Sequence, residues 1–317
     1  MKRTIALAAI ALLLAASVFA SGSSETLRFG TGGDQGTYYG FGNILAQRVS
    51  SETDTKVTAV VSAGSQDNIE MMDMGSYQLG FVQSDVMSYA YNGTNLFAET
   101  GAVTGFSTVA ALYLEQVQIV TLDPSIKTVA DLRGKTVSIG SSGSGVYYNA
   151  LDILGAYGIT EKDIHPTYQS FGDSVDALQD GKIDAAFVVA GAPTVAVSTL
   201  ASTHKVRLVS IDDEHIESLI AVSPYYTPYT IKSSVYGTDE DCQTVAVGAV
   251  VIANNTVSED AVYDFVSTVF NDKAEIAKSH DKGNELDLAF ASSITNVPYH
   301  PGAAKYFAEQ GIEVPTN

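Results

Sequence analysis

Two glycine-rich turns stand where a short apolar run gives way to a helical pattern. The first is Phe29–Tyr39, which reads Phe-Gly-Thr-Gly-Gly-Asp-Gln-Gly-Thr-Tyr-Tyr, and the second is Val137–Val146, which reads Val-Ser-Ile-Gly-Ser-Ser-Gly-Ser-Gly-Val. The first turn of a helix leaves backbone N–H groups without partners and carries partial positive charge, so such a turn suits a carboxylate or a phosphate. Two such turns about a hundred residues apart predict two lobes that each offer a helix start to one small ligand.

Side chains near these turns and at the ends of neighbouring strands are the candidate ligand contacts. We expect the ligand to meet residues of both turns: Gly32, Gly33, Tyr38, Ser142, Ser144, Gly145 and Val146. Ser65 and Asn68 follow the predicted strand through Val61, and Gln83 and Asp85 follow the next strand. Helix capping alone would explain Ser65 and Asn68 about as well as ligand binding.

Glu115 is the sharpest single candidate. It lies inside a long apolar run, Thr108–Leu122, close to Tyr113, whose ring offers an apolar face with a hydroxyl tip. A glutamate among apolar neighbours needs a partner, because burying an unpaired charge is costly. A ligand ammonium group and a salt bridge across a hinge are equally good partners, and the sequence leaves both open.

The elements expected around these residues alternate between strands and helices, as in α/β proteins. Thr108–Leu122 is much longer than an ordinary strand and is predicted to cross from one lobe to the other. We therefore expect lobe 1 to comprise residues 26–114 plus about 243–317, and lobe 2 residues 115–242. The return crossover is placed within 212–242, which is read as an irregular connection. A cleft between the lobes would hold the ligand.

The N-terminus is typical of export. Lys2 and Arg3 precede an apolar run, and small residues precede a cleavage site after Ala20, so residues 1–20 are predicted to be a signal peptide and 21–25 a flexible leader. This predicts a periplasmic or other extracytoplasmic location. Cys242 is the single cysteine of the sequence, so no intramolecular disulfide and no lipid anchor at the cleavage site are expected.

The charge balance argues against nucleic acid and anionic lipid as partners. The formal charge is −19, from 17 basic and 36 acidic residues, and loss of Lys2 and Arg3 makes it −21. None of the arginines of the mature chain lies in the glycine-rich turns. An anionic ligand would therefore be held by backbone N–H groups, serines and tyrosines.

Several catalytic and cofactor motifs fail on inspection. Gln35 occupies the third glycine position of a dinucleotide fingerprint, and Val129 occupies the first glycine position of a P-loop. The Gly-x-Ser-x-Gly pattern of a nucleophile elbow is absent around Ser142, because Ser144 replaces its second glycine. The histidines and the lone cysteine show no zinc-ligand spacing, and no calcium loop is found. We therefore expect no enzyme, no metal and no cofactor.

Taken together, the motifs resemble the TAXI-type solute receptors of TRAP transporters. The matching pieces appear in the order of that family and cover nearly the whole mature chain: Gly30–Tyr39, Ser62–Asn68, Leu112–Glu115, Asp131–Val137, Gly140–Gly145, Ala186–Pro193 and His300–Ala303 with Tyr306 and Gly311. The resemblance implies a two-lobed type II periplasmic-binding fold that closes around glutamate, glutamine or a related C4–C5 carboxylate. It also implies a sodium-driven transporter as the membrane partner, and it carries over a set of pocket residues: Tyr38, Ser65, Asn68, Gln83, Tyr113, Glu115 and Ser144.

Three positions depart from the pattern of that family. Val146 stands where threonine is usual, and Gly40 and Leu114 replace common prolines. The first change removes a hydroxyl group at a helix start, which would suit a less polar solute.

The resulting hypothesis is a monomeric, non-catalytic receptor for a small anionic or zwitterionic solute. The alternatives are a binding protein of an ABC importer or a sensor system, a secreted hydrolase that uses Ser144 or Asp85, and a scaffold protein.

Overall fold

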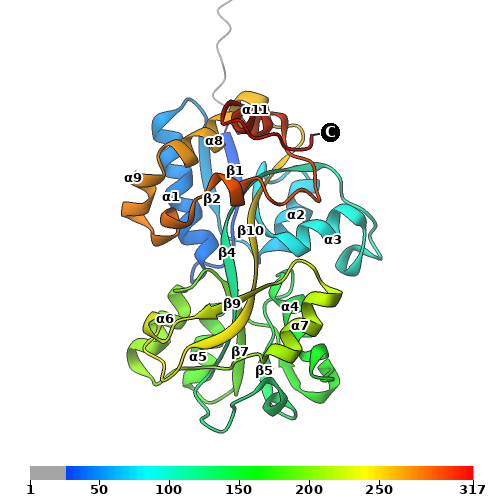
Figure 1. The fold of residues 1–317 in the computed structure, drawn as a ribbon, viewed down its shortest axis with the longest axis vertical. Coiled ribbons are helices and arrows are strands. Elements are labelled where there is room, and N and C mark those ends of the chain that lie inside the picture. Colours follow the sequence, from blue (N-terminus) through cyan, green and yellow to red (C-terminus); the bar gives the residue numbers. More distant parts are fainter. Residues whose placement is uncertain (1–25, 317) are drawn as a thin grey trace, which may run out of the picture.

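The computed structural model describes residues 26–316, so the predicted signal peptide and the leader lie outside the described residues. These residues form two α/β lobes, one above the other in Figure 1, joined by long strands in the middle. The sheet runs through both lobes in the order β2-β1-β3-β10-β4-β7-β5-β6, with β8 paired to β4 and β9 to β10. No helix within 26–316 is long and apolar enough to cross a membrane.

Lobe 1 is the upper half of Figure 1 and holds both ends of the described chain. Its parallel strands β1 and β2 pair along their length, and β1 also pairs with β3, so their carboxyl ends point the same way. Its elements are β1 (Thr26–Gly30), α1 (Thr37–Glu52), β2 (Lys56–Val60), α2 (Ser65–Asp73), β3 (Leu79–Gln83), α3 (Ser84–Asn92), η1 (Asn95–Phe97), α8 (Glu259–Asn271), α9 (Lys273–Ser279), η5 (Asp281–Glu285), α10 (Leu288–Ala291) and α11 (Pro301–Glu309).

Lobe 2 repeats the same arrangement with β5, which pairs in parallel with β6 and β7. Its helices begin at the carboxyl ends of these strands, opposite the helix starts of lobe 1. Its elements are η2 (Val129–Leu132), β5 (Thr136–Ser138), α4 (Val146–Ala156), η3 (Glu161–Asp163), β6 (His165–Thr167), α5 (Phe171–Gln179), β7 (Ala185–Ala190), α6 (Val195–Thr203), β8 (Arg207–Leu208), α7 (Asp213–Val222), β9 (Thr227–Ile231) and η4 (Ser233–Val235).

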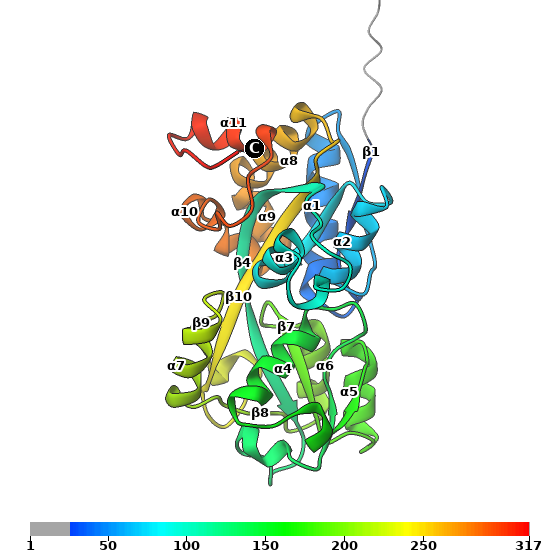
Figure 2. The ribbon, with the colours of Figure 1, turned by 90° about the vertical axis from the view of Figure 1, so that its right-hand side faces the viewer.

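Two antiparallel strands connect the lobes, β4 (Phe106–Thr121) and β10 (Cys242–Asn254), and Figure 2 shows them passing side by side between the halves. The predicted crossing strand is therefore present. Glu115 is paired with Val247 and Gln116 with Ala246, which places both polar residues at the waist of the molecule. The register shifts between Ala249 and Val250, an irregularity of the kind that bends a strand.

The lobes have separate hydrophobic cores, and both crossing strands change core at the waist. On β4, Tyr113 packs in the core of lobe 1 and Val117 in that of lobe 2. On β10, Val247 packs in lobe 2 and Ala249 in lobe 1. We therefore propose lobe boundaries near residue 115 and near residue 248, the second a few residues later than the 242/243 boundary inferred from the sequence.

The segment 212–242 differs from its expected irregular form. It holds α7, capped by the Asp212 side chain, and β9, which pairs antiparallel with Cys242–Ala246 of β10. Ile216 and Leu219 bury one face of α7 in the core of lobe 2. The segment therefore completes lobe 2, and β10 itself makes the return crossing.

Candidate ligand-binding site

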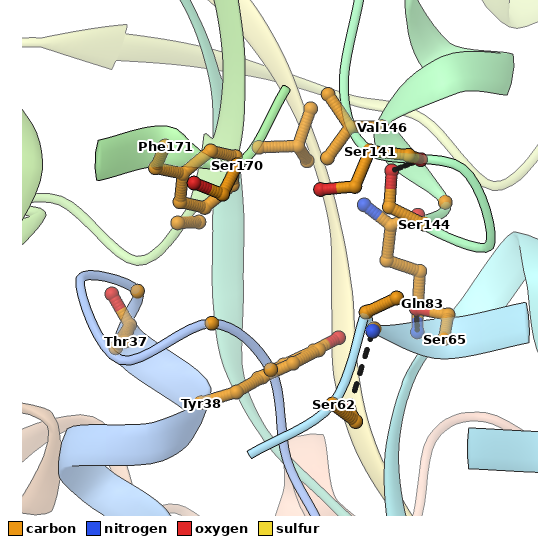
Figure 3. Close-up of a pocket in the computed structure, with 18 of the residues that line it drawn as sticks. Thr37, Tyr38, Ser62, Ser65, Gln83, Ser141, Ser144, Val146, Ser170 and Phe171 are labelled. Atoms are coloured by element: carbon orange, nitrogen blue, oxygen red, sulfur yellow. Dashed lines mark hydrogen bonds between the residues drawn. The ribbon is translucent and has the colours of Figure 1, made fainter. Parts of the chain in front are cut away.

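A cavity of about 90 Å³ lies between the lobes, at the carboxyl ends of β1, β3, β5 and β7. Figure 3 shows it with Thr37, Tyr38, Ser62 and Gln83 on the side of lobe 1, and with Ser141, Val146, Ser170 and Phe171 on the side of lobe 2. Its lining residues are Gly32, Gly33, Gly36, Thr37, Tyr38, Ser62, Ala63, Gly64, Ser65, Gln83, Glu115, Ser141, Ser144, Gly145, Val146, Ser170, Phe171, Val189 and Ala190.

Three of the helices that start at this cavity are each preceded by a glycine. Gly36, Gly64 and Gly145 occupy the N-cap positions of α1, α2 and α4, and none of these starts has a side-chain cap. Other helices are capped in the usual way, for example α8 by Ser258 and α7 by Asp212. A side-chain cap would occupy N–H groups of the first turn, so a glycine N-cap leaves more of them available to a solute. In α2 the N–H of Asp67 is already taken by the carbonyl of Gly143.

The glycines also permit a close approach of the lobes. A Cβ added at Gly145 would come within 1.7 Å of Gln83 Oε1 and 2.9 Å of Val86 Cγ2, both of which belong to lobe 1. Gly64 has φ of 117°, in the region that favours glycine, and lies against Ser144 of lobe 2.

Direct hydrogen bonds join the two lobes around the cavity. The backbone N–H of Asp67 donates to the carbonyl of Gly143 at 3.1 Å, and the N–H of Ala196 donates to the carbonyl of Gln35 at 3.2 Å. On the same side, the hydroxyl of Thr37 donates to the carbonyl of Gly191 at 2.7 Å. The structure therefore represents a closed arrangement of the lobes.

A buried carboxyl group lies at the floor of the cavity. Glu115 is 2% exposed, and its Oε2 accepts a hydrogen bond from the hydroxyl of Tyr38 at 2.5 Å. Burial raises the pKa of Glu115 to about 8, while the bond from Tyr38 and the nearby Lys282 act in the opposite direction. No ion pair within residues 26–316 includes Glu115. The sequence left two partners open for Glu115, a ligand ammonium group and a basic residue across the hinge. Among the described residues, the second of these is absent.

A buried amide network lies beside the cavity and crosses from lobe to lobe. Gln83 Nε2 donates to Asn149 Oδ1 at 2.9 Å, and Asn149 Nδ2 donates to Asp85 Oδ2 at 2.9 Å and to the hydroxyl of Tyr226 at 2.8 Å. Burial raises the pKa of Asp85 to about 6. This network ties the start of α3 to α4 and orients the Gln83 side chain at the cavity wall.

Most of the residues that the sequence nominated for the ligand come together here. The residues that line the cavity are Gly32, Gly33, Tyr38, Ser65, Gln83, Glu115, Ser144, Gly145 and Val146. Their contact with a ligand stays a prediction.

Four other nominated residues do not line the cavity. Asn68 is fully buried, and its Nδ2 donates to the carbonyls of Thr31 and Phe81, so it ties strand ends together. Asp85 belongs to the network of Asn149, and Tyr113 packs behind the cavity under Lys282. Ser142 is exposed, whereas Ser141 and Ser144 of the same loop line the cavity.

Sequence reasoning missed the wall formed by lobe 2. Ser170 and Phe171 line the cavity at the start of α5. Ser170 caps this helix and Asp173 follows three residues later, a pattern that marks a helix start in the sequence. Val189 and Ala190, at the end of β7, complete the wall.

The lining residues carry no lysine, arginine or histidine. Within residues 26–316, no group of histidine, cysteine, aspartate or glutamate side chains is arranged to hold a metal ion. The starts of α1, α2 and α4 supply positive potential at the cavity wall, and Lys282, which does not line the cavity, adds to it near Glu115.

The strand order and the two crossing strands define the type II fold of periplasmic binding proteins, and comparison with solved structures supports this. A structure described as a periplasmic transporter matches with a TM-score of 0.58 and 17% identity, over 92% of this chain and 99% of that chain. The alkanesulfonate-binding protein SsuA from Xanthomonas axonopodis pv. citri, bound to MOPS, matches with a TM-score of 0.51 and 17% identity, over 90% and 93%. The periplasmic binding protein STM4351 of Salmonella typhimurium, described as specific for arginine, matches with a TM-score of 0.50 and 14% identity, over 81% and 98%. At these identities the likeness shows the fold alone.

The chain itself belongs to the NMT1-like family, whose model matches residues 29–311.

Proposed function

We propose that this protein is an extracytoplasmic solute-binding receptor that captures a small carboxylate or an amino acid between its lobes. Glutamate, glutamine and C4–C5 dicarboxylates are the first candidates, as the resemblance to TAXI-type receptors implies. The closed protein delivers the solute to the membrane subunits of a TRAP-type, sodium-driven transporter.

The observation that carries this proposal is the convergence of helix starts from both lobes on one cavity. Gly36 and Gly64 begin helices in lobe 1, and Gly145 begins one in lobe 2. A helix start contributes about 0.3–1 kcal/mol toward an anion at an exposed site and up to about 2 kcal/mol when partly buried. Several such starts with additional hydrogen bonds can reach the roughly 8 kcal/mol of micromolar binding.

A solute held by both lobes stabilises the closed arrangement, because it binds that arrangement better than the open one. The fold likeness to structures described as binding an alkanesulfonate or arginine agrees with a receptor of this kind.

The residues at the cavity do not support the alternative function of a hydrolase. Ser144 Oγ donates to the carbonyl of Ser141 at 2.8 Å, and no histidine is among the described lining residues. Asp85 is fully buried in the network of Asn149.

Binding to a solute panel tests the receptor function. Calorimetry and thermal shift on the purified mature protein would be run with amino acids, monocarboxylates and dicarboxylates. We expect at least one solute to bind in the micromolar range and to raise the melting temperature, and silence across the whole panel would contradict the proposal.

Reconstitution with candidate membrane subunits tests the partner. Uptake that follows a sodium gradient supports a TRAP-type transporter. Uptake that requires ATP supports the alternative, an ABC importer.

A further inference from the structure

The two sides of the cavity differ in polarity. Lobe 2 contributes four apolar side chains from three elements, and Val146, Val189 and Ala190 are 5%, 4% and 2% exposed. Phe171 completes this surface, which we call the apolar wall. Lobe 1 faces it with the ring of Tyr38 and with the buried carboxyl group of Glu115.

The hydroxyl groups around the cavity are largely engaged within the protein. Ser144 Oγ donates to the Ser141 carbonyl, and Ser170 Oγ donates to Asp173 Oδ2 at 2.6 Å. Ser65 Oγ accepts from the N–H of Gln83, and Ser62 Oγ accepts from the N–H of Gly64.

The Thr37 hydroxyl and the Gln83 amide nitrogen are also engaged, with Gly191 and Asn149, whereas Gln83 Oε1 is buried without a partner and can only accept. The donors left for a solute are the hydroxyls of Ser62 and Ser141 and the starts of α1, α2 and α4, which is a limited supply for a highly polar solute.

This supply of donors matches one carboxylate better than two. The lining residues include no cationic side chain, and the nearest buried carboxyl group, Glu115, would repel a second anion when ionised. A buried carboxylate without partners is costly. Short aliphatic groups, in contrast, gain stability by leaving water for contact with the apolar wall.

The volume of the cavity matches a small solute. A volume of about 90 Å³ gives about six to nine water-sized positions. This is the size of valine or leucine, and several dicarboxylates are equally small, so polarity rather than size makes the distinction.

Building on the proposed receptor function, we propose that the site selects a solute with one carboxylate and a short aliphatic body. The carboxylate binds at the helix starts and the aliphatic body packs on the apolar wall. Val146 is the residue of this wall that sets the preference, because it lies in the first turn of α4, between the carboxylate position and the apolar surface.

The test compares matched probes by calorimetry on the wild-type mature protein. The aliphatic probes are L-valine, L-leucine and isovalerate, and the polar probes are L-glutamate, glutarate and succinate. We expect the best aliphatic probe to bind at least about tenfold more tightly than every polar probe. L-Valine and isovalerate differ by the ammonium group, so their ratio reports whether Glu115 accepts an ammonium group.

Val146→Thr keeps the shape of the side chain and adds a hydroxyl group. We expect it to weaken binding of the best aliphatic probe by about five- to tenfold, because that hydroxyl would face aliphatic groups. Val222→Thr is the matched control, since Val222 is 81% exposed on α7, and it should change neither affinity nor melting temperature. The melting temperature of Val146→Thr without solute shows whether the variant is folded.

The outcomes separate this inference from the receptor function. Tighter binding of a polar probe than of every aliphatic probe overturns the selectivity and leaves the receptor function standing. An unchanged affinity in folded Val146→Thr overturns the role of Val146. Absence of binding by all six probes overturns the selectivity, and absence of binding across the whole solute panel overturns the receptor function as well.

Discussion

At the scale of single residues, Glu115 links the site to pH. Burial raises its pKa to about 8 from an ordinary value of 4.5, so the folded protein keeps a proton between these values that the unfolded chain loses. Stability falls with rising pH wherever the folded state binds more protons, so Glu115 weakens the fold progressively from about pH 5 to pH 8. We expect Glu115→Gln to flatten this dependence and to stabilise the protein by up to a few kcal/mol at pH 8, as measured by urea unfolding.

Neighbouring groups define the controls for this experiment. Asp85 has a pKa of about 6 for the same reason and acts in the same direction, but over a lower pH window. The slope between pH 6 and 8 is therefore the diagnostic one. Glu217→Gln makes the same change at an exposed position and should leave that slope intact. A Glu115→Gln slope equal to that of wild type would show that Glu115 ionises normally in the folded protein.

Two residues nominated from the sequence lie at the cavity wall. Glu115 was nominated because it lies inside a long apolar run, and Gln83 because it follows a predicted strand, and both line the cavity. Tyr113 shares a strand face with Glu115 but lies about 7 Å earlier along β4, where Phe41 and Phe81 cover it. The sequence carries no signal for how far along a crossing strand the core ends.

At the scale of elements, the glycine before α4 acts through the other lobe. Gly145 has φ of −69° and ψ of −21°, so alanine fits its backbone. An added Cβ would meet Gln83 and Val86 of lobe 1, and Gln83 cannot move away without losing its bond to Asn149. We expect Gly145→Ala to lower solute affinity at least about tenfold, because it obstructs closure. Calorimetry with the best solute of the panel measures this.

The control lies in the same helix. Gly155 has nothing within 4 Å of an added Cβ, so Gly155→Ala should preserve affinity and stabilise α4 by about 1 kcal/mol. Both variants should remain folded without solute. Equal affinities for the two variants would mean that the lobes do not approach at Gly145 when solute binds.

Element prediction failed where tertiary pairing supplies the order. β9 has mostly exposed side chains and contains Pro228, so its sequence lacks the apolar alternation of a strand. It becomes a strand because β10 offers an edge to pair with. The start of α5, in contrast, could have been predicted from the sequence, since Ser170 and Asp173 have the spacing of a capping pair.

At the scale of the whole molecule, the alternation of strands and helices, the two glycine-rich turns and the long crossing strand were enough to predict two lobes around a cleft. The second boundary that we propose lies later than the one inferred from the sequence, because β10 reads as one uniform apolar run from Thr244 to Ala253 while it changes core near Gly248. Which lobe a buried residue packs in depends on partners that are far away in the sequence. That information is not present in local periodicity.

The closed arrangement itself can be trapped. Gln35 lies in the turn before α1 of lobe 1 and Gly172 in the first turn of α5 of lobe 2, and a Cβ added at Gly172 would be 4.0 Å from Gln35 Cβ. This is within the Cβ separation of disulfides, and Gly172 does not have the positive φ that would strain another residue. Cys242 will not compete, because it is 3% exposed and burial raises the pKa of its thiol to about 11. In Gln35→Cys/Gly172→Cys we therefore expect an intramolecular disulfide on mild oxidation, seen as a faster band on a non-reducing gel. Its formation should speed up several-fold with a bound solute, since the solute raises the closed population.

The pair Gln35→Cys/Gly155→Cys is the control. An added Cβ at position 155 has nothing within 4 Å, so this pair should remain reduced under the same conditions. If the first pair forms no disulfide even with saturating solute, the lobes do not meet at the mouth of the cavity as they do in this structure.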